Sequence, residues 1–201
     1  MASHRAIAGL MQALESLLKH RLPPRLGGED VTGTMVKLLA SADFKKKDVT
    51  TQLGLWLYRL EVDANGRNVW NRPPAGSLRP AQPVLPLNLH FLVVSWSPIA
   101  ALEIALHAWA MQQLSSMPEL DGVQLADAAP AGEEPWLDGE RVQIAPEEVP
   151  MEDLLRLWDA LPMKYSLTSC WVMRTVRVAL DREDGAGLAR TRVFPFAAAV
   201  P

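Results

Sequence analysis

Residues Leu87–Trp96 read LNLHFLVVSW and carry the strongest strand signal in the chain. The stretch is rich in β-branched and aromatic residues and contains no internal proline or glycine, as expected for a strand inside a sheet. Ser97-Pro98 follows at once, in the order of a helix cap and a first-turn proline, and apolar residues then recur at helical spacing as far as Leu114. The sequence therefore predicts a strand with a helix directly behind it.

Further helix and strand signals lie on both sides of this unit. Apolar residues at three- and four-residue steps predict a first helix, capped by Ser3 and stopped by Pro23 and Pro24. The remaining expected elements are strands at Val31–Ala40 and Gln52–Val62, a short strand at Arg141–Ala145, a helix from Pro150 to Leu161, and one or two strands within Met163–Leu180. In Gln52–Val62 both faces are apolar, which indicates a strand covered on two sides.

The length of 201 residues suits one domain. We expect an α/β (α+β) domain over residues 1–182, in which about three helices pack on a mixed, mostly antiparallel sheet. Two loop excursions are expected inside it: residues 63–86, which contain five prolines, and residues 117–140, which are acidic. Residues 183–201 are expected to form a flexible C-terminal tail.

Composition excludes several classes of protein. The hydrophobic fraction of 49% and the charged fraction of 21% are typical of globular domains. A net charge of −3 gives no basic field for nucleic acid, and no apolar run is long enough to span a membrane. The N-terminal residues lack the continuous apolar core of a secretory signal, so we expect a soluble chain made in the cytoplasm.

Charge is unevenly distributed along the chain. Residues 1–100 carry twelve Lys or Arg and seven Asp or Glu, whereas residues 117–150 carry nine acids and only Arg141. Such a dipolar subunit could meet copies of itself head to tail, although solvated loops explain the same numbers.

A search for catalytic or cofactor chemistry finds little. The histidines His4, His20, His90 and His107 show no metal-ligand spacing, and the lone Cys170 excludes an internal disulfide or a multi-thiolate zinc site. Phosphate-binding glycine motifs and a nucleophile elbow are absent. We therefore predict no catalytic residue, no metal and no cofactor; a site assembled from His90, His107 or Cys170 is a minor alternative.

Two tryptophans and a lysine run are the candidate contact residues. Trp70 and Trp136 lie in proline-containing loops, where an indole either covers its own core or anchors in another chain. Lys45–Lys47 is either a solubilising loop or a contact for an acidic partner.

Several ordered phrases resemble a known family. They are LWLYRL at residues 55–60, NVWNRPP at 68–74, PLNLHFLV at 86–93, EIALHAW at 103–109, MEDLLRLWDAL at 151–161 and YSLT at 165–168. Together they resemble the N-terminal domain of the cap or tail-terminator proteins of extracellular contractile injection systems, the antifeeding-prophage and virulence-cassette type of phage-tail-like particle. The likeness covers roughly residues 5–180.

This resemblance implies a structural protein with a fold similar to phage tail terminators. It implies a homohexameric ring that sits on the distal end of the tube and sheath, ends tail polymerisation and stabilises the particle. The partners are then further copies of the chain and the tube and sheath proteins, with no nucleic acid and no membrane. Assembly is expected in the cytoplasm, in a particle that is later released.

The family offers no catalytic motif to transfer, and some members continue into a further C-terminal domain. The alternative from another class is an assembly adaptor or chaperone that is not retained in the particle. Loop context alone nominates the interface candidates Lys45, Lys46, Lys47, Trp70, Arg72, Glu133, Glu134, Trp136 and Phe194.

Overall fold

The computed structural model describes residues 4–45, 50–65, 84–127, 136 and 140–179. A six-stranded sheet with the order β3-β4-β5-β8-β7-β6 forms its centre. Its strands are β3 (Met35–Leu38), β4 (Gln52–Val62), β5 (Val84–Trp96), β6 (Glu119–Leu120), β7 (Val142–Pro146) and β8 (Thr168–Ala179). Only β3 and β4 pair in parallel. The predicted mixed, mostly antiparallel sheet is confirmed.

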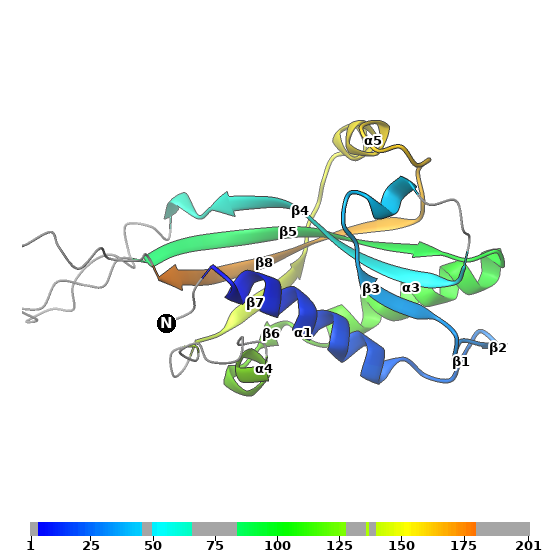
Figure 1. Ribbon diagram of the computed structural model, residues 1–201, viewed down its shortest axis with the longest axis horizontal. Coiled ribbons are helices and arrows are strands. Elements are labelled where there is room, and N and C mark those ends of the chain that lie inside the picture. Colours follow the sequence, from blue (N-terminus) through cyan, green and yellow to red (C-terminus); the bar gives the residue numbers. More distant parts are fainter. Residues whose placement is uncertain (1–3, 46–49, 66–83, 128–135, 137–139, 180–201) are drawn as a thin grey trace, which may run out of the picture.

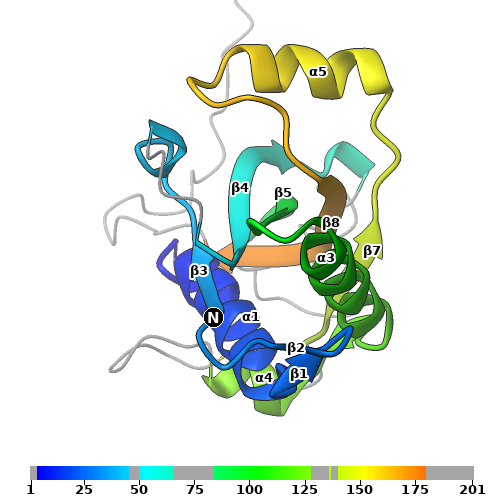
Figure 2. The same cartoon turned by 90° about the vertical axis from the view of Figure 1, so that its right-hand side faces the viewer.

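Helices cover both faces of the curled sheet (Figures 1 and 2). Three of them lie on one face: α1 (Ala6–Arg21), α3 (Ala100–Ser115) and the short α4 (Gly122–Asp127). On the opposite face lie α5 (Met151–Asp159) and the 3-10 helix η1 (Asp43–Lys45). Figure 2 shows α5 above the strands, and α1, α3 and α4 below them.

Each face of the sheet has its own hydrophobic core. The first core contains buried side chains of α1 and α3, such as Leu14 and Leu106, and the strand residues that point toward them. The second core is smaller and includes Phe44, Trp96 and Trp158. Because successive strand residues point to opposite faces, β4 serves both cores, with Leu53 and Leu55 in the first and Trp56 against the second. The expected two-sided covering of this strand is confirmed.

A β-bulge in β8 keeps its apolar residues on the first core. Leu87 pairs with Val176 and Leu89 with Met173, so two residues of β8 stand opposite one of β5. One of these two, Thr175, has a φ of 62°, which a non-glycine residue seldom adopts. The extra residue shifts the alternation by one, and Met173 and Val176 are therefore both buried in the first core.

Several predicted boundaries are wrong by a few residues. The expected strand Val31–Ala40 shortens to Met35–Leu38, because the Asp30 carboxylate accepts hydrogen bonds from the backbone N–H and hydroxyl of Thr32 and forms a turn there. Helix α1 has Arg5, not Ser3, at its N-cap, and Ser3 lies outside the described residues. Helix α3 begins at Ala100, two residues after Pro98, and Pro150 is the N-cap of α5 instead of its first residue.

The acidic segment 117–140 is more than an excursion. It supplies β6 and α4, and it places Leu120, Leu125 and Trp136 in the first core. At its end Glu140 is only 2% exposed and lies 3.1 Å, Oε1 to Nε, from Arg177 of β8. Parts of this acidic segment are therefore structural, and they close one edge of the sheet.

The glycine pair after α1 is a hairpin turn. Strands β1 (Arg25–Leu26) and β2 (Glu29–Asp30) pair antiparallel around Gly27 and Gly28, whose φ values are 58° and 92°. A two-residue turn with both φ values positive matches the right-handed twist of the flanking strands, and glycine adopts it without steric cost.

Candidate functional site

A buried polar cluster lies on the α5 side of the sheet. His90 of β5 is 6% exposed, and its Nδ1 lies 2.8 and 2.9 Å from the two carboxylate oxygens of Glu147. The hydroxyl of Tyr58 donates to Glu147 Oε2 at 3.2 Å. The other imidazole nitrogen, Nε2, lies 3.3 Å from Glu61 Oε2 but outside hydrogen-bond geometry. The cluster links β4 and β5 to the segment between β7 and α5.

This arrangement does not activate a nucleophile. Burial raises the pKa of the Cys170 thiol to about 11, and the negative charge of Glu147 acts in the same direction. Burial, followed by the charge of Glu147, also raises the pKa of Tyr58, so this hydroxyl stays protonated and donates. A thiol and a phenol held in their neutral forms suit structural hydrogen bonding better than covalent catalysis.

The minor alternative of one site built from His90, His107 and Cys170 is not assembled. His107 of α3 is 4% exposed on the opposite face of the sheet, and its Nδ1 lies 3.1 Å from the hydroxyl of Ser95. Burial lowers the pKa of His107. Within the described ranges, no three His, Cys, Asp or Glu side chains form a group that could hold a metal ion.

Helix α5 is held by aromatic contacts. The ring of Phe44 packs edge-on against Trp56, Trp96 and Trp158, with centroid separations of 4.8, 6.3 and 6.0 Å. The indole N–H of Trp96 donates to Ser166 Oγ at 2.8 Å. These contacts fix α5 and the following segment over the sheet, and they leave the outer side of both open.

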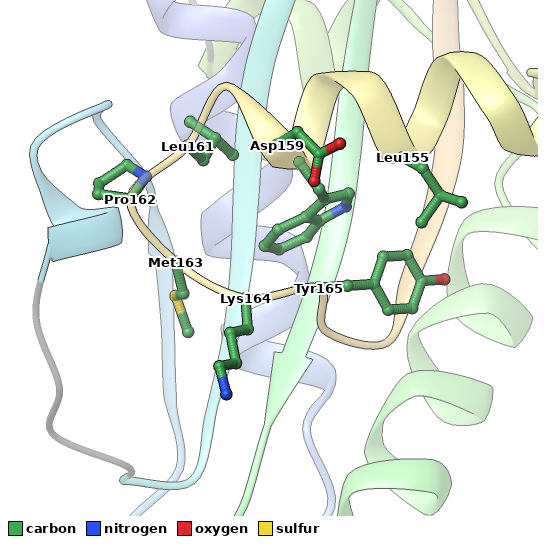
Figure 3. A pocket seen from close by; sticks show the side chains of 8 residues that line it. Leu155, Asp159, Leu161, Pro162, Met163, Lys164 and Tyr165 are labelled. Carbon is green, nitrogen blue, oxygen red and sulfur yellow. The ribbon is translucent and has the colours of Figure 1, made fainter.

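A groove of about 400 Å³ lies between α5 and the segment that follows it (Figure 3). Its lining residues are Leu155, Trp158, Asp159, Leu161, Pro162, Met163, Lys164 and Tyr165. Trp158 is 2% exposed and its ring centroid lies 5.7 Å from that of Tyr165. Such a surface combines aromatic rings, aliphatic side chains and a few polar groups, which is typical of protein contact sites.

Most of the predicted interface candidates lie outside the described residues. These are Lys46, Lys47, Trp70, Arg72, Glu133, Glu134 and Phe194. The backbone of Lys45 ends η1, directly after the buried Phe44. Trp136 is 7% exposed and belongs to the first core, so its burial favours the alternative that this indole covers its own chain.

Sequence reasoning missed the groove beside α5. The sequence pattern places Met151, Leu154, Leu155, Trp158 and Leu161 on one face of the predicted helix, yet Met151 is 60% and Leu155 is 42% exposed. The signal was available, because a nine-residue helix with five large apolar residues carries more apolar surface than one contact with a sheet covers.

Comparison with protein families identifies the chain. The model of the Pvc16 N-terminal domain matches residues 9–192. The chain belongs to the Pvc16 N-terminal domain family. The family resemblance predicted from the ordered phrases is thereby confirmed. No curated protein sequence matches the chain.

Two solved structures share the fold of this family member. One is a sheath/tube terminator of an extracellular contractile injection system, PVC, in the extended state; it is 14% identical, with a TM-score of 0.60 over 100% of this chain and 67% of that chain. The other is the anti-feeding prophage cap, described as a tube terminating cap; it is 15% identical, with a TM-score of 0.51 over 94% of this chain and 59% of that chain. The chain thus spans about three fifths to two thirds of their lengths.

Among the described residues, no helix has both the length and the apolar composition that crossing a bilayer requires.

Proposed function

We propose that the protein is a structural terminator of a contractile injection particle, which caps the end of its tube and sheath. The observation that carries the proposal is the family match over residues 9–192, together with a fold shared along the whole chain with a protein named as a sheath/tube terminator. Both solved relatives are named for a terminating or capping role. These names favour a terminator over an assembly adaptor.

The ring itself is part of this proposal. A terminator must match the symmetry of the tube end, and a closed ring uses two different surfaces of each subunit for its contacts. The excess of positive charge in residues 1–100 and of negative charge in residues 117–150 would suit two unlike surfaces of this kind. We infer a homo-oligomer, with six subunits as the stoichiometry to test, and contacts to both tube and sheath.

The remaining finer statements are proposals of the same kind. We propose assembly in the cytoplasm as part of a particle that is then released, and no catalytic activity. The neutral thiol of Cys170 and the separation of His90 from His107 by the sheet support the second statement. Neither nucleic acid nor membrane is proposed as a partner.

The test is negative-stain electron microscopy of particles from cells that lack only this gene. We expect overlong, ragged or unsheathed tubes, because nothing then ends their growth. Complementation with the intact gene is the control. Particles of normal length with a closed end would contradict the terminator role. Mass spectrometry of purified particles separates the adaptor, which would be absent, from a terminator, which would be present in stoichiometric amounts.

A further inference from the structure

The groove beside α5 has an apolar rim that the described part of the chain leaves uncovered. Leu154 and Trp158 point into the second core, whereas Met151, Leu155 and Tyr165 are 60%, 42% and 45% exposed. Leu155 and Tyr165 line the groove directly (Figure 3). Large apolar side chains gathered around a concave surface mark an interaction site more often than isolated ones do.

The groove also contains a buried donor without an acceptor. Trp158 is 2% exposed, and its indole Nε1–H has no hydrogen-bond partner within the described ranges. An unsatisfied buried donor costs about 1–3 kcal/mol. This donor lies beneath the floor of the groove, so it bears on the packing of Trp158 in the second core and not on the choice of occupant.

Charge around the groove is mostly negative. Glu148, Glu152, Asp153 and Asp159 lie on or beside α5, against Arg156 and Lys164. Arg156 is engaged by Glu152 and Asp153, at 2.6 and 3.6 Å. Asp159 lines the groove and has no such partner among the residues that the structure describes. The fitting occupant therefore carries apolar side chains next to a positive charge.

A segment late in the sequence has this chemistry. Residues 190–196 read RTRVFPF, with two arginines, no acid, and the apolar residues Val193, Phe194 and Phe196. Pro195 has no backbone N–H to satisfy and restrains φ to about −65°, which suits an extended bound segment. Extended proline-containing peptides bind aromatic-lined grooves in this way.

Geometry separates the groove from its own tail. Strand β8 begins at Thr168, three residues after Tyr165, and runs for 12 residues to Ala179, roughly 36 Å away at about 3.3 Å per residue. A flexible chain of 14 residues, the number between Ala179 and Phe194, would have a root-mean-square span of about 21 Å. Binding its own groove would require this linker to stretch from about 21 Å to about 36 Å, within its extended reach of about 50 Å. The groove of a neighbouring copy carries no such requirement.

We propose that the groove beside α5 binds residues 190–196 of a second copy of the chain. Phe194 and Phe196 then pack on Leu155 and Tyr165, and Arg190 or Arg192 pairs with Asp159. The inference rests on the self-assembly in the proposed function and names one of its contacts.

Cross-linking of the purified full-length protein tests this contact. Leu155→Cys and Phe194→Cys are prepared as separate variants, mixed, and treated with a short bismaleimide. We expect a covalent heterodimer to form at least about tenfold faster than in a control mixture of Ile104→Cys and Phe194→Cys, because binding raises the local concentration of the two thiols. Ile104 is the matched control, since it is an apolar residue on α3 with 63% exposure. The native Cys170 is 9% exposed, and the unmodified protein reports its background reaction.

Each outcome decides the proposal. Slower cross-linking at higher salt, or with Asp159→Asn added to the groove variant, supports it through the predicted charge pairing. Equal rates with Leu155→Cys and Ile104→Cys would overturn it. A double variant with both Leu155→Cys and Phe194→Cys that yields only cross-linked monomer would also overturn it, because the tail would then bind the groove of its own chain. Faster cross-linking of Leu155→Cys to a Trp70→Cys variant than to Phe194→Cys would overturn it as well. All of these readouts concern the contact alone, so they are independent of the tube-length test of the terminator role.

Discussion

The two faces of the sheet differ in how completely they are covered. On one face, α1, α3 and α4 enclose a core of mainly aliphatic side chains, and Leu10, Leu14, Leu106 and Leu114 are all 0% exposed. On the other, one short helix packs through aromatic rings. It leaves Met151 and Leu155 exposed, and the buried Trp158 indole N–H has no hydrogen-bond partner among the described residues. The comparison indicates that the first face supplies most of the stability and that the second combines packing with a contact surface.

The largest expected difference is in the free energy of unfolding, between alanine substitutions of two leucines that lie on opposite faces of the sheet. Leu14→Ala leaves a cavity in the first core and is expected to lower the free energy of unfolding by about 2–5 kcal/mol. Leu155→Ala, on the outer side of α5, removes mostly exposed surface and is expected to change it by less than about 0.5 kcal/mol. Urea denaturation measures both. Similar losses for the two variants would break the proposed division between the faces.

A smaller effect is expected at Gly54 of β4, where the second core is tightly packed. A Cβ atom at this position would clash with the side chain of Leu39 and lie 3.0 Å from Cζ3 of Trp96. Gly54→Ala is therefore expected to cost about 1–3 kcal/mol through overpacking. Gly33→Ala is the matched control, because nothing lies within 4 Å of a Cβ there. If thermal unfolding of the Gly54 variant matched that of the control, the second core would be looser than the structure indicates.

The smallest expected effect is a pH dependence that belongs to the first face. Burial lowers the pKa of His107 below its ordinary value of 6.5, so the unfolded chain takes up a proton at this site before the folded chain does. Stability is therefore complete above about pH 6.5 and falls as the pH drops below it, by at most about 1.4 kcal/mol per pH unit for one proton. His107→Gln removes this contribution. Urea midpoints between pH 7.5 and 5 that decline equally in parent and variant would refute it.

Local patterns predicted the sheet because its strands have strong local signals. Gln52–Val62 was predicted with its observed bounds, since alternating residues on it face two different cores. Strand β5 extends three residues further than predicted, to Val84, because its pairing with Ala179 of β8 is a long-range contact that the proline-rich sequence before it obscures. The family resemblance, which rests on phrases from several elements, pointed to the terminator fold.

The candidate site could not be predicted in the same way. The groove depends on how the segment 161–165 folds back against α5, and that position is set by contacts of Phe44 and Ser166 with residues distant in sequence. Trp136 is a second case, because its loop context left open whether the indole covers its own core or anchors in another chain, and only the tertiary structure places it in the first core. Neither the position of the groove nor the burial of Trp136 can be read from the residues that neighbour them in the sequence.

The parallel pairing of β3 with β4 has a consequence for the order of folding. Parallel neighbours need a crossover, and here the connection carries Phe44 over the sheet to meet Trp158, more than a hundred residues later in the chain. Contacts of such high sequence separation require a costly chain closure, so they form late in folding. We expect the α5 layer to be the last part to assemble and the first to exchange its amide hydrogens, as a cooperative unit that opens before the rest of the domain.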